Sequence, residues 1–201
     1  MNFFRKIFDR LEEVRAARIA DLLQPHLARG ESVLDFGCGS QIVADALQRK
    51  CGVRILGLDT LDISKHDLPR EIFSGGRTRF EDGSFDTVLI AFVLHHCDDG
   101  GVEILHEAHR LARRQVLVLE DSYHNPAERV AMRLADRFLN WLEDPRIPVP
   151  LRFRTSAEWC ALFAEIGFTL VATKRMRTTP ILNTRQILFV LKPHAAAHFG
   201  S

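Results

Sequence analysis

The 201-residue sequence contains few cysteines, and none has the close spacing that binds zinc or forms a redox pair. The four cysteines, Cys38, Cys51, Cys97 and Cys160, are scattered along the chain. Scattered thiols are typical of reduced proteins, so we expect a cytoplasmic location. No uncharged stretch is long enough to cross a membrane, and acids interrupt the first residues where a secretory signal needs an apolar run. We therefore expect no integral membrane association.

The sequence also lacks an excess of one charge sign. Its net charge is +1, so no overall field favours nucleic acid or a membrane surface as the partner. Locally, acidic residues outnumber basic ones in 31–125, and basic residues outnumber acidic ones in 145–192. Two differently solvated faces would explain this unevenness, and so would a basic rim for an anionic substrate. The sequence leaves both explanations open.

Short apolar segments alternate with helical patterns through most of the chain. Strands are predicted at 32–36, 54–59, 85–93, 115–120, 168–173 and 186–191, and helices at 3–27, 42–48, 102–113, 127–142 and 156–166. Such alternation is typical of a parallel sheet with right-handed crossovers. The two late strands have no helix between them, so they must pair as a hairpin. Length and composition predict one α/β domain with its own core.

Two glycines follow the first predicted strand, in V-L-D-F-G-C-G-S at 33–40. In an open parallel sheet, ligands bind beyond the carboxyl ends of the strands, where the first strand turns into its helix. Gly37 and Gly39 let the backbone turn sharply there and let a ligand approach main-chain amides. A dinucleotide site needs a third glycine, but Ile42 occupies that position. The loop therefore disfavours NAD and FAD.

Four segments in order resemble the motifs of class I S-adenosylmethionine-dependent methyltransferases, in the small-molecule branch that resembles ubiquinone/menaquinone methyltransferases. The segments are V-L-D-F-G-C-G-S (33–40), G-L-D (57–59), F-E-D-G-S-F-D-T-V-L-I-A-F-V-L-H-H (80–96) and E-I-L-H-E-A-H-R-L-A-R-R-Q-V-L-V-L-E (103–120). The resemblance implies a Rossmann-like fold with a seven-stranded, mostly parallel sheet whose last strand is antiparallel. It implies one domain, with an N-terminal helix (1–30), a cofactor-binding core (31–120), an insertion or lid (121–154) and a C-terminal helix with antiparallel strands (155–193).

The resemblance also implies S-adenosyl-L-methionine as the cofactor. Asp59 would accept hydrogen bonds from both ribose hydroxyls. The implied cofactor-binding residues are Asp35, Gly37, Cys38, Gly39, Ser40, Asp59, Thr60, Ala91 and Phe92. The sequence departs from the family at Gln41, where members usually have glycine, and at 72–80, where an acid for the adenine is missing. Backbone groups at 74–77 would hold the adenine instead.

Three side chains are candidates for the catalytic groups: His95, His96 and Tyr123. Methyl transfer from a sulfonium needs a base only when the acceptor must lose a proton, and histidine titrates in the right range. His95 and His96 follow a strand, so they could be a base, a lining of the cofactor pocket or a structural pair. Tyr123, the chain's single tyrosine, either contacts substrate or lies in a polar loop. No set of His, Asp and Glu shows metal-ligand spacing, so no metal is expected.

The acceptor would be covered by the segments outside the core. These carry apolar and aromatic side chains, Phe3, Phe4, Ile7 and Phe8 in the first helix and Met132, Phe138, Trp141 and Phe153 in the insertion. Core packing explains such stripes, and so does a lid over an apolar or aromatic small molecule. We therefore expect a small-molecule methyltransferase. The alternatives are a non-catalytic S-adenosylmethionine-binding regulator or assembly protein and, third, an NAD-type oxidoreductase. The sequence does not indicate an oligomeric state.

Overall fold

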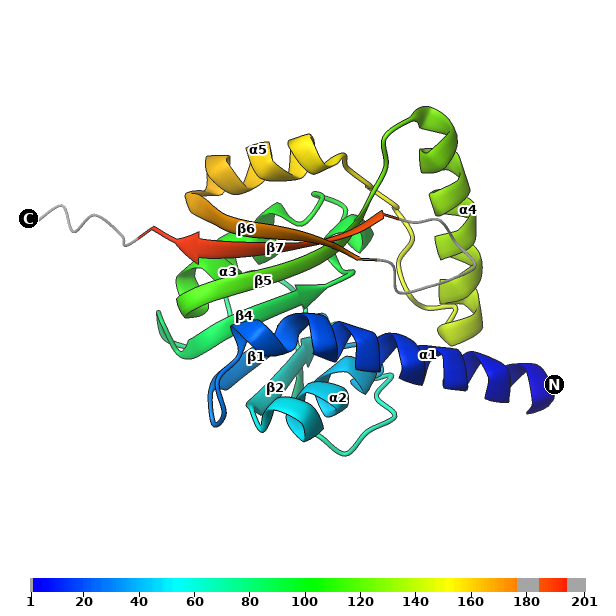
Figure 1. Cartoon of the computed structure of the whole chain (residues 1–201), viewed down its shortest axis with the longest axis horizontal. Helices are drawn as coiled ribbons and strands as arrows, with labels where there is room; N and C mark the ends of the chain where they lie inside the picture. The colour runs from blue at the N-terminus through cyan, green and yellow to red at the C-terminus, as the bar shows by residue number, and fades with distance from the viewer. Residues whose placement is uncertain (1, 177–184, 195–201) are drawn as a thin grey trace, which may run out of the picture.

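A seven-stranded sheet organises the computed structural model, which describes residues 2–176 and 185–194, with side chains from residue 6 (Figure 1). The strand order is β3-β2-β1-β4-β5-β7-β6. The pairs among the first five strands in this order are parallel, whereas β7 runs antiparallel to both β5 and β6. The structure thus confirms the predicted Rossmann-like methyltransferase topology with an antiparallel last strand.

The strands are β1 (Ser32–Phe36), β2 (Arg54–Asp59), β3 (Arg70–Ile72), β4 (Phe85–Ala91), β5 (Ala112–Ser122), β6 (Phe168–Met176) and β7 (Arg185–Pro193). The α-helices are α1 (Asn2–Leu23), α2 (Ile42–Cys51), α3 (Val102–Leu111), α4 (Pro126–Glu143) and α5 (Ser156–Ile166). Single 3-10 turns, η1 (Gln24–His26) and η2 (Leu94–His96), follow α1 and β4. Among the described residues, no helix combines the length and apolar character that crossing a bilayer requires.

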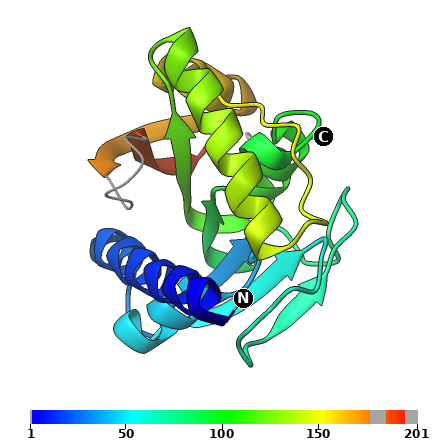
Figure 2. The ribbon, with the colours of Figure 1, turned by 90° about the vertical axis from the view of Figure 1, so that its right-hand side faces the viewer.

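Helices cover both faces of the sheet, so side chains alternate between two cores. On one face, Val116 and Val118 of β5 pack with Trp159 and Phe163 of α5 and with residues of α3. On the other, Leu117 and its neighbours pack against α1 and α2. Figure 2 shows α4 running across one end of the sheet, with α1 beside the same end. The two helices therefore border the edge at which the parallel strands finish.

Local sequence explains where several elements begin and end. Thr155 and Glu158 form a capping box that starts α5, and Gly167 ends it in the left-handed region at φ 100°. Asn125 accepts a hydrogen bond from the Glu128 amide and so caps α4. The bounds of β1, β2 and α5 agree with those predicted at 32–36, 54–59 and 156–166.

The other elements differ from the prediction by one to four residues at one or both ends, and two of these differences have a clear cause. The strand predicted at 85–93 ends at Ala91, because Phe92 adopts a left-handed φ of 60° that an extended strand cannot continue. The helix predicted to reach residue 113 ends at Leu111, because Ala112 already pairs with Phe85 in the sheet. β5 thus follows α3 without a loop. Its pairing with β4 on one side and β7 on the other fixes the position of the residues at its carboxyl end.

Candidate active site

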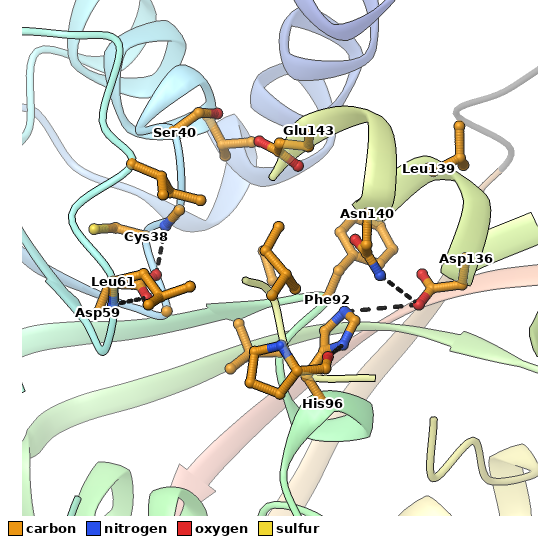
Figure 3. Close-up of a pocket in the computed structure, with 18 of the residues that line it drawn as sticks. Cys38, Ser40, Asp59, Leu61, Phe92, His96, Asp136, Leu139, Asn140 and Glu143 are labelled. Atoms are coloured by element: carbon orange, nitrogen blue, oxygen red, sulfur yellow. Dashed lines mark hydrogen bonds and ion pairs between the residues drawn. The ribbon is translucent and has the colours of Figure 1, made fainter. Parts of the chain in front are cut away.

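A cavity of about 800 Å³ opens beyond the carboxyl ends of β1, β2 and β4. The strand order reverses between β1 and β4, which is where open α/β sheets bind ligands. The glycine loop and the end of β2 form one wall of the cavity, and the end of β4 forms its floor. α1 contributes Phe8, Leu11 and Arg15, and α4 contributes Met132 and Leu139. Figure 3 shows the side chains that face this space.

The glycine loop needs its two glycines for different reasons. Gly37 has a φ of 81°, and a Cβ atom there would lie 2.4 Å from Cγ2 of Val93, so no side chain fits. Gly39 has a φ of 49°, and a Cβ atom there would meet nothing within 4 Å. Gly37 therefore lets the loop pack against the end of β4, whereas Gly39 leaves its backbone open to the cavity.

Gln41 stands where the family resemblance implied a glycine, and its contacts account for the difference. Its φ of 60° lies in the left-handed region, which glycine adopts without strain. The buried Gln41 side chain accepts a hydrogen bond from Ser64 Oγ (2.6 Å) and donates one to the Pro69 carbonyl (3.3 Å). These bonds to the 61–69 loop hold a non-glycine residue in that conformation.

Two carboxylates lie near the ends of neighbouring strands at the glycine loop, Asp59 as the last residue of β2 and Asp35 as the second-last residue of β1. Asp59 Oδ2 accepts a hydrogen bond from the Gly39 amide (2.7 Å), and Oδ1 accepts one from the Leu61 amide (3.0 Å). Asp59 lines the cavity, whereas Asp35 is buried behind the loop. Burial, together with the nearby negative charge of Asp59, raises the pKa of Asp35 to about 7. Both groups favour a positively charged ligand.

Glu120 organises the turn that follows β4. This fully buried carboxylate accepts hydrogen bonds from the amides of Val93 (2.9 Å) and Leu94 (2.7 Å) through one oxygen. Its other oxygen lies 2.6 Å from Nδ1 of His95. Burial alone would lower the pKa of His95, but the carboxylates of Glu120 and Asp136 outweigh it and raise the pKa to about 10.

His96 differs from its neighbour because it faces the cavity. Its Nδ1 donates a hydrogen bond to the Pro148 carbonyl (2.8 Å), and its Nε2 lies 3.8 Å from Oδ2 of Asp136. Burial and the charge of His95 lower the pKa of His96 to about 4. The His96 ring is therefore neutral at physiological pH. Asp136, on α4, also accepts a hydrogen bond from the Asn140 side chain (2.7 Å; Figure 3).

The family model described as "Methyltransferase domain" matches residues 6–173. The chain belongs to this family. This match confirms the class predicted from the four motifs, and with it S-adenosylmethionine as the type of cofactor. No sequence among curated proteins matches the chain.

Solved structures share the fold of this methyltransferase at low sequence identity. A chain from the complex of the Haloferax volcanii Trm112 methyltransferase activator aligns with a TM-score of 0.69 and 18% identity, covering 94% of this chain and 92% of that one. Geranyl diphosphate C-methyltransferase from Streptomyces coelicolor A3(2) gives a TM-score of 0.63 and 14% identity, covering 88% and 78%. The [4+2]-cyclase SpnF gives 0.65 and 14%, covering 88% and 80%. Because a cyclase shares the fold, these likenesses show architecture and not the reaction.

The methyltransferase brings most of its predicted site residues to the cavity. The lining includes Gly37, Cys38, Gly39, Ser40, Asp59, Thr60, Ala91, Phe92 and His96. Three predicted residues are not among those that line it. Asp35 and His95 are buried behind it, and Tyr123 packs against the apolar cluster of Met132, Leu151 and Phe153. A direct substrate contact by Tyr123 has no support in this geometry.

The sequence indicated α4 as part of a lid, but not which face of the helix meets the cavity. Met132 lines the cavity as expected, whereas Phe138 and Trp141 are exposed and are not among the lining residues. Asp136, Leu139, Asn140 and Glu143 all line the cavity, and their spacing of i, i+3, i+4 and i+7 places them on one helix face. The helix itself was predicted, so this spacing was the available signal. The sequence spacing showed no metal-ligand set, but the fold brings Asp136 close to His95 and His96, so the expectation of no metal stays a prediction.

The charges around the cavity are mostly negative. Its lining carries the carboxylates Glu12, Asp59, Asp98, Asp99, Glu103, Asp121, Asp136 and Glu143, against the guanidinium groups of Arg15 and Arg18. Arg146, Arg152 and Arg154 from the basic segment are not among the residues that line it. Arg154 instead donates to the Gly100 carbonyl and stacks over Trp159, with its guanidinium carbon 4.7 Å from the ring centroid. The cavity thus suits a cation better than an anion.

Proposed function

We propose that the protein binds S-adenosylmethionine in this cavity and transfers its methyl group to a small, apolar or aromatic organic molecule. The observation that carries the proposal is the hydrogen bond between Asp59 and the open Gly39 backbone. It joins the two elements that would hold the ribose and the methionine end of a sulfonium nucleoside. The volume of about 800 Å³ lies in the range of ligand cavities and leaves room for a second molecule.

The cavity divides into two regions that fit the two substrates. The acids Asp35 and Asp59 lie at the glycine loop, where the cationic cofactor would bind. Phe8, Leu11, Met132, Leu139, Ile147 and Phe153 line the region under α1 and α4, where an apolar acceptor would bind. Two neighbours of this fold, both geranyl diphosphate methyltransferases, were solved with S-adenosylhomocysteine or S-adenosylmethionine and support the cofactor.

The chain's contribution to methyl transfer is mainly alignment and exclusion of water. The thioether leaves as a neutral group and needs no acid, so the rate depends on holding the acceptor in line with the methyl group. His96 lies where it can accept a hydrogen bond from the acceptor. With a pKa lowered to about 4 it is a weak base, so we assign it an orienting role rather than proton removal.

Calorimetry with S-adenosylmethionine and, separately, with NAD tests the cofactor. We expect a saturable heat with the former and none with the latter, because Ile42 blocks the dinucleotide geometry. Incubation with S-adenosylmethionine and extracted metabolites, followed by mass spectrometry for the gain of one methyl group, tests turnover. Cofactor binding without any methylated product from matched extracts would favour the regulator or assembly protein. The absence of cofactor binding would remove the proposal.

Cofactor affinity is expected to rise from about pH 6 to about pH 8, around the Asp35 pKa of about 7. Below that pKa, Asp35 is protonated, and binding of the cationic cofactor favours the ionised form, so binding releases the proton. The affinity should therefore change by up to about tenfold per pH unit there and level off above it. The same raised pKa means that the stability contributed by protonated Asp35 is lost as pH rises through about 7.

Isothermal titrations in buffers of different ionisation enthalpy measure both the affinity and the proton released. Asp35→Asn should flatten the pH dependence, because the amide carries no titratable proton. A pH profile that is equally steep in Asp35→Asn would assign the proton to another group.

A further inference from the structure

Three side chains from two distant segments converge beside the acceptor region of the cavity. His95 and His96 lie in the 3-10 turn η2 after β4, and Asp136 lies on α4. One ligand atom from each residue lies within 4.8 Å of the others. His95 Nε2 is 3.6 Å from Asp136 Oδ1, and His96 Nε2 is 3.8 Å from Asp136 Oδ2. Figure 3 shows Asp136 and His96 pointing toward one another across the cavity wall.

Both imidazole rings are held from behind through Nδ1. His96 Nδ1 must donate to the Pro148 carbonyl, which only accepts, so the neutral ring carries its lone pair on Nε2. His95 Nδ1 is bonded to the carboxylate of Glu120. Carboxylates and backbone carbonyls in this outer position are the usual supports of metal-binding histidines. Each ring therefore presents Nε2 toward Asp136 in the orientation that a metal ion requires.

The spaces between these atoms are too wide for hydrogen bonds. His95 Nε2 has no hydrogen-bond partner, although the side chain is only 1% exposed. An N–H···O hydrogen bond spans about 2.7–3.2 Å, shorter than either separation to Asp136. Ligand atoms about 2.0–2.2 Å from a tetrahedral ion lie roughly 3.3–3.6 Å apart. The observed 3.6 and 3.8 Å, measured to the two different oxygens of Asp136, are close to this spacing. The three ligand atoms together lie within 4.8 Å of one another, so the side chains would draw closer on binding an ion.

We propose that His95, His96 and Asp136 bind a divalent transition-metal ion, with Zn²⁺ as the ion that this donor set suits. Imidazole nitrogen and carboxylate oxygen are both ligands of zinc, and three protein ligands leave one position open. His96 and Asp136 line the cavity, so the open position faces it. Nε2 of His96 would then be a metal ligand, so the bound ion would take over from His96 the orienting of the acceptor.

An acceptor hydroxyl or thiol bound at the open position would have a lowered pKa and would lose its proton more readily to water. The deprotonated acceptor would then be the nucleophile that attacks the methyl group. This catalytic role rests on the proposed methyl transfer, whereas metal binding itself does not. The competing arrangement is a protonated His95 whose charge balances Glu120 and Asp136 without an ion.

Metal titration of the full chain, made without a histidine tag and freed of metal by a chelator, tests the site. We expect one Zn²⁺ per chain by calorimetry and little response to Mg²⁺, which prefers oxygen ligands. His96→Ala and Asp136→Asn should each weaken Zn²⁺ binding by about 10–100-fold or more. His106→Ala is the matched control, because His106 is an exposed histidine on α3, and it should bind Zn²⁺ as the unmodified chain does.

Co²⁺ absorption of the unmodified chain gives a second readout that needs no variant. Intense visible bands from a four- or five-coordinate ion support the site, and the weak spectrum of the hydrated ion would overturn it. Zn²⁺ affinity that is unchanged in both His96→Ala and Asp136→Asn would overturn it as well. Thermal denaturation and S-adenosylmethionine binding of each variant separate lost ligands from lost folding. Because these titrations use neither cofactor nor acceptor, their failure leaves the proposed methyl transfer intact.

Discussion

Replacing Asp59 by alanine is expected to weaken S-adenosylmethionine binding by about 1–3 kcal/mol, which is roughly 5–150-fold in Kd. The Asp59 carboxylate faces the cavity, and its two bonds to the Gly39 and Leu61 amides leave further lone pairs for ribose hydroxyls. Alanine removes those acceptors and also frees the glycine loop from the end of β2. Calorimetric titration of the cofactor measures the change.

Asp62→Ala is the matched control for this prediction. Asp62 lies three residues further along the same loop, is 57% exposed and pairs with Arg70 away from the cavity. Its removal should leave cofactor affinity unchanged. Asp59→Asn keeps one acceptor oxygen and should give an intermediate affinity. If Asp59→Ala binds the cofactor as tightly as the unmodified chain, the ribose lies elsewhere and the proposed placement fails.

Replacing Glu120 by alanine is expected to lower the free energy of unfolding by about 3–5 kcal/mol, the cost of breaking a buried ion pair by removing one partner. The carboxylate satisfies two backbone amides and Nδ1 of His95 in a site without solvent exposure. Its removal leaves all three donors without a hydrogen-bond partner and leaves the His95 ring without its main counter-charge. Urea unfolding of the cofactor-free protein measures the change.

Glu165→Ala, an exposed position on α5, provides the comparison and should stay within about 0.5 kcal/mol of the unmodified chain. Glu120→Gln retains the shape and one acceptor oxygen, so it should cost less than Glu120→Ala. A loss below about 1 kcal/mol in Glu120→Ala would mean that water replaces the carboxylate and that the turn after β4 does not depend on it.

Much of the fold followed from local patterns, because each long strand and helix carries its own periodicity. β1, β2 and α5 agree with the prediction at both ends, since a glycine, a capping threonine or a strand-ending acid marks them in the sequence. β3 was not predicted as a strand. Its three residues, Arg70–Ile72, are mostly polar, and they become extended only by pairing with β2. Such a strand depends on tertiary contacts and leaves no pattern of its own.

The candidate site shows the same division between local and distant causes. The glycine loop and Asp59 were found because a short motif places them at one edge of the sheet. Asp136 was missed because its relation to His96 depends on how α4 folds back over that edge, 40 residues along the chain. The unusual backbone conformation of Gln41 could be inferred only in part from the sequence. The missing glycine was noted, but the compensating bonds to Ser64 and Pro69 depend on the fold.

The uneven anchoring of α1 bears on how ligands reach the cavity. Its second half is fixed in the core by Ile19 and Leu23, which are 1% and 0% exposed. In its first half, Ile7 and Leu11 are 43% and 45% exposed, although Leu11 still borders the cavity. Moving the first half of α1 outward would therefore uncover little further apolar surface, which makes it the part of the cavity wall that can open at least cost for substrate and product. In such an arrangement the opening rate of that helix, rather than the chemical step, can set the speed of turnover.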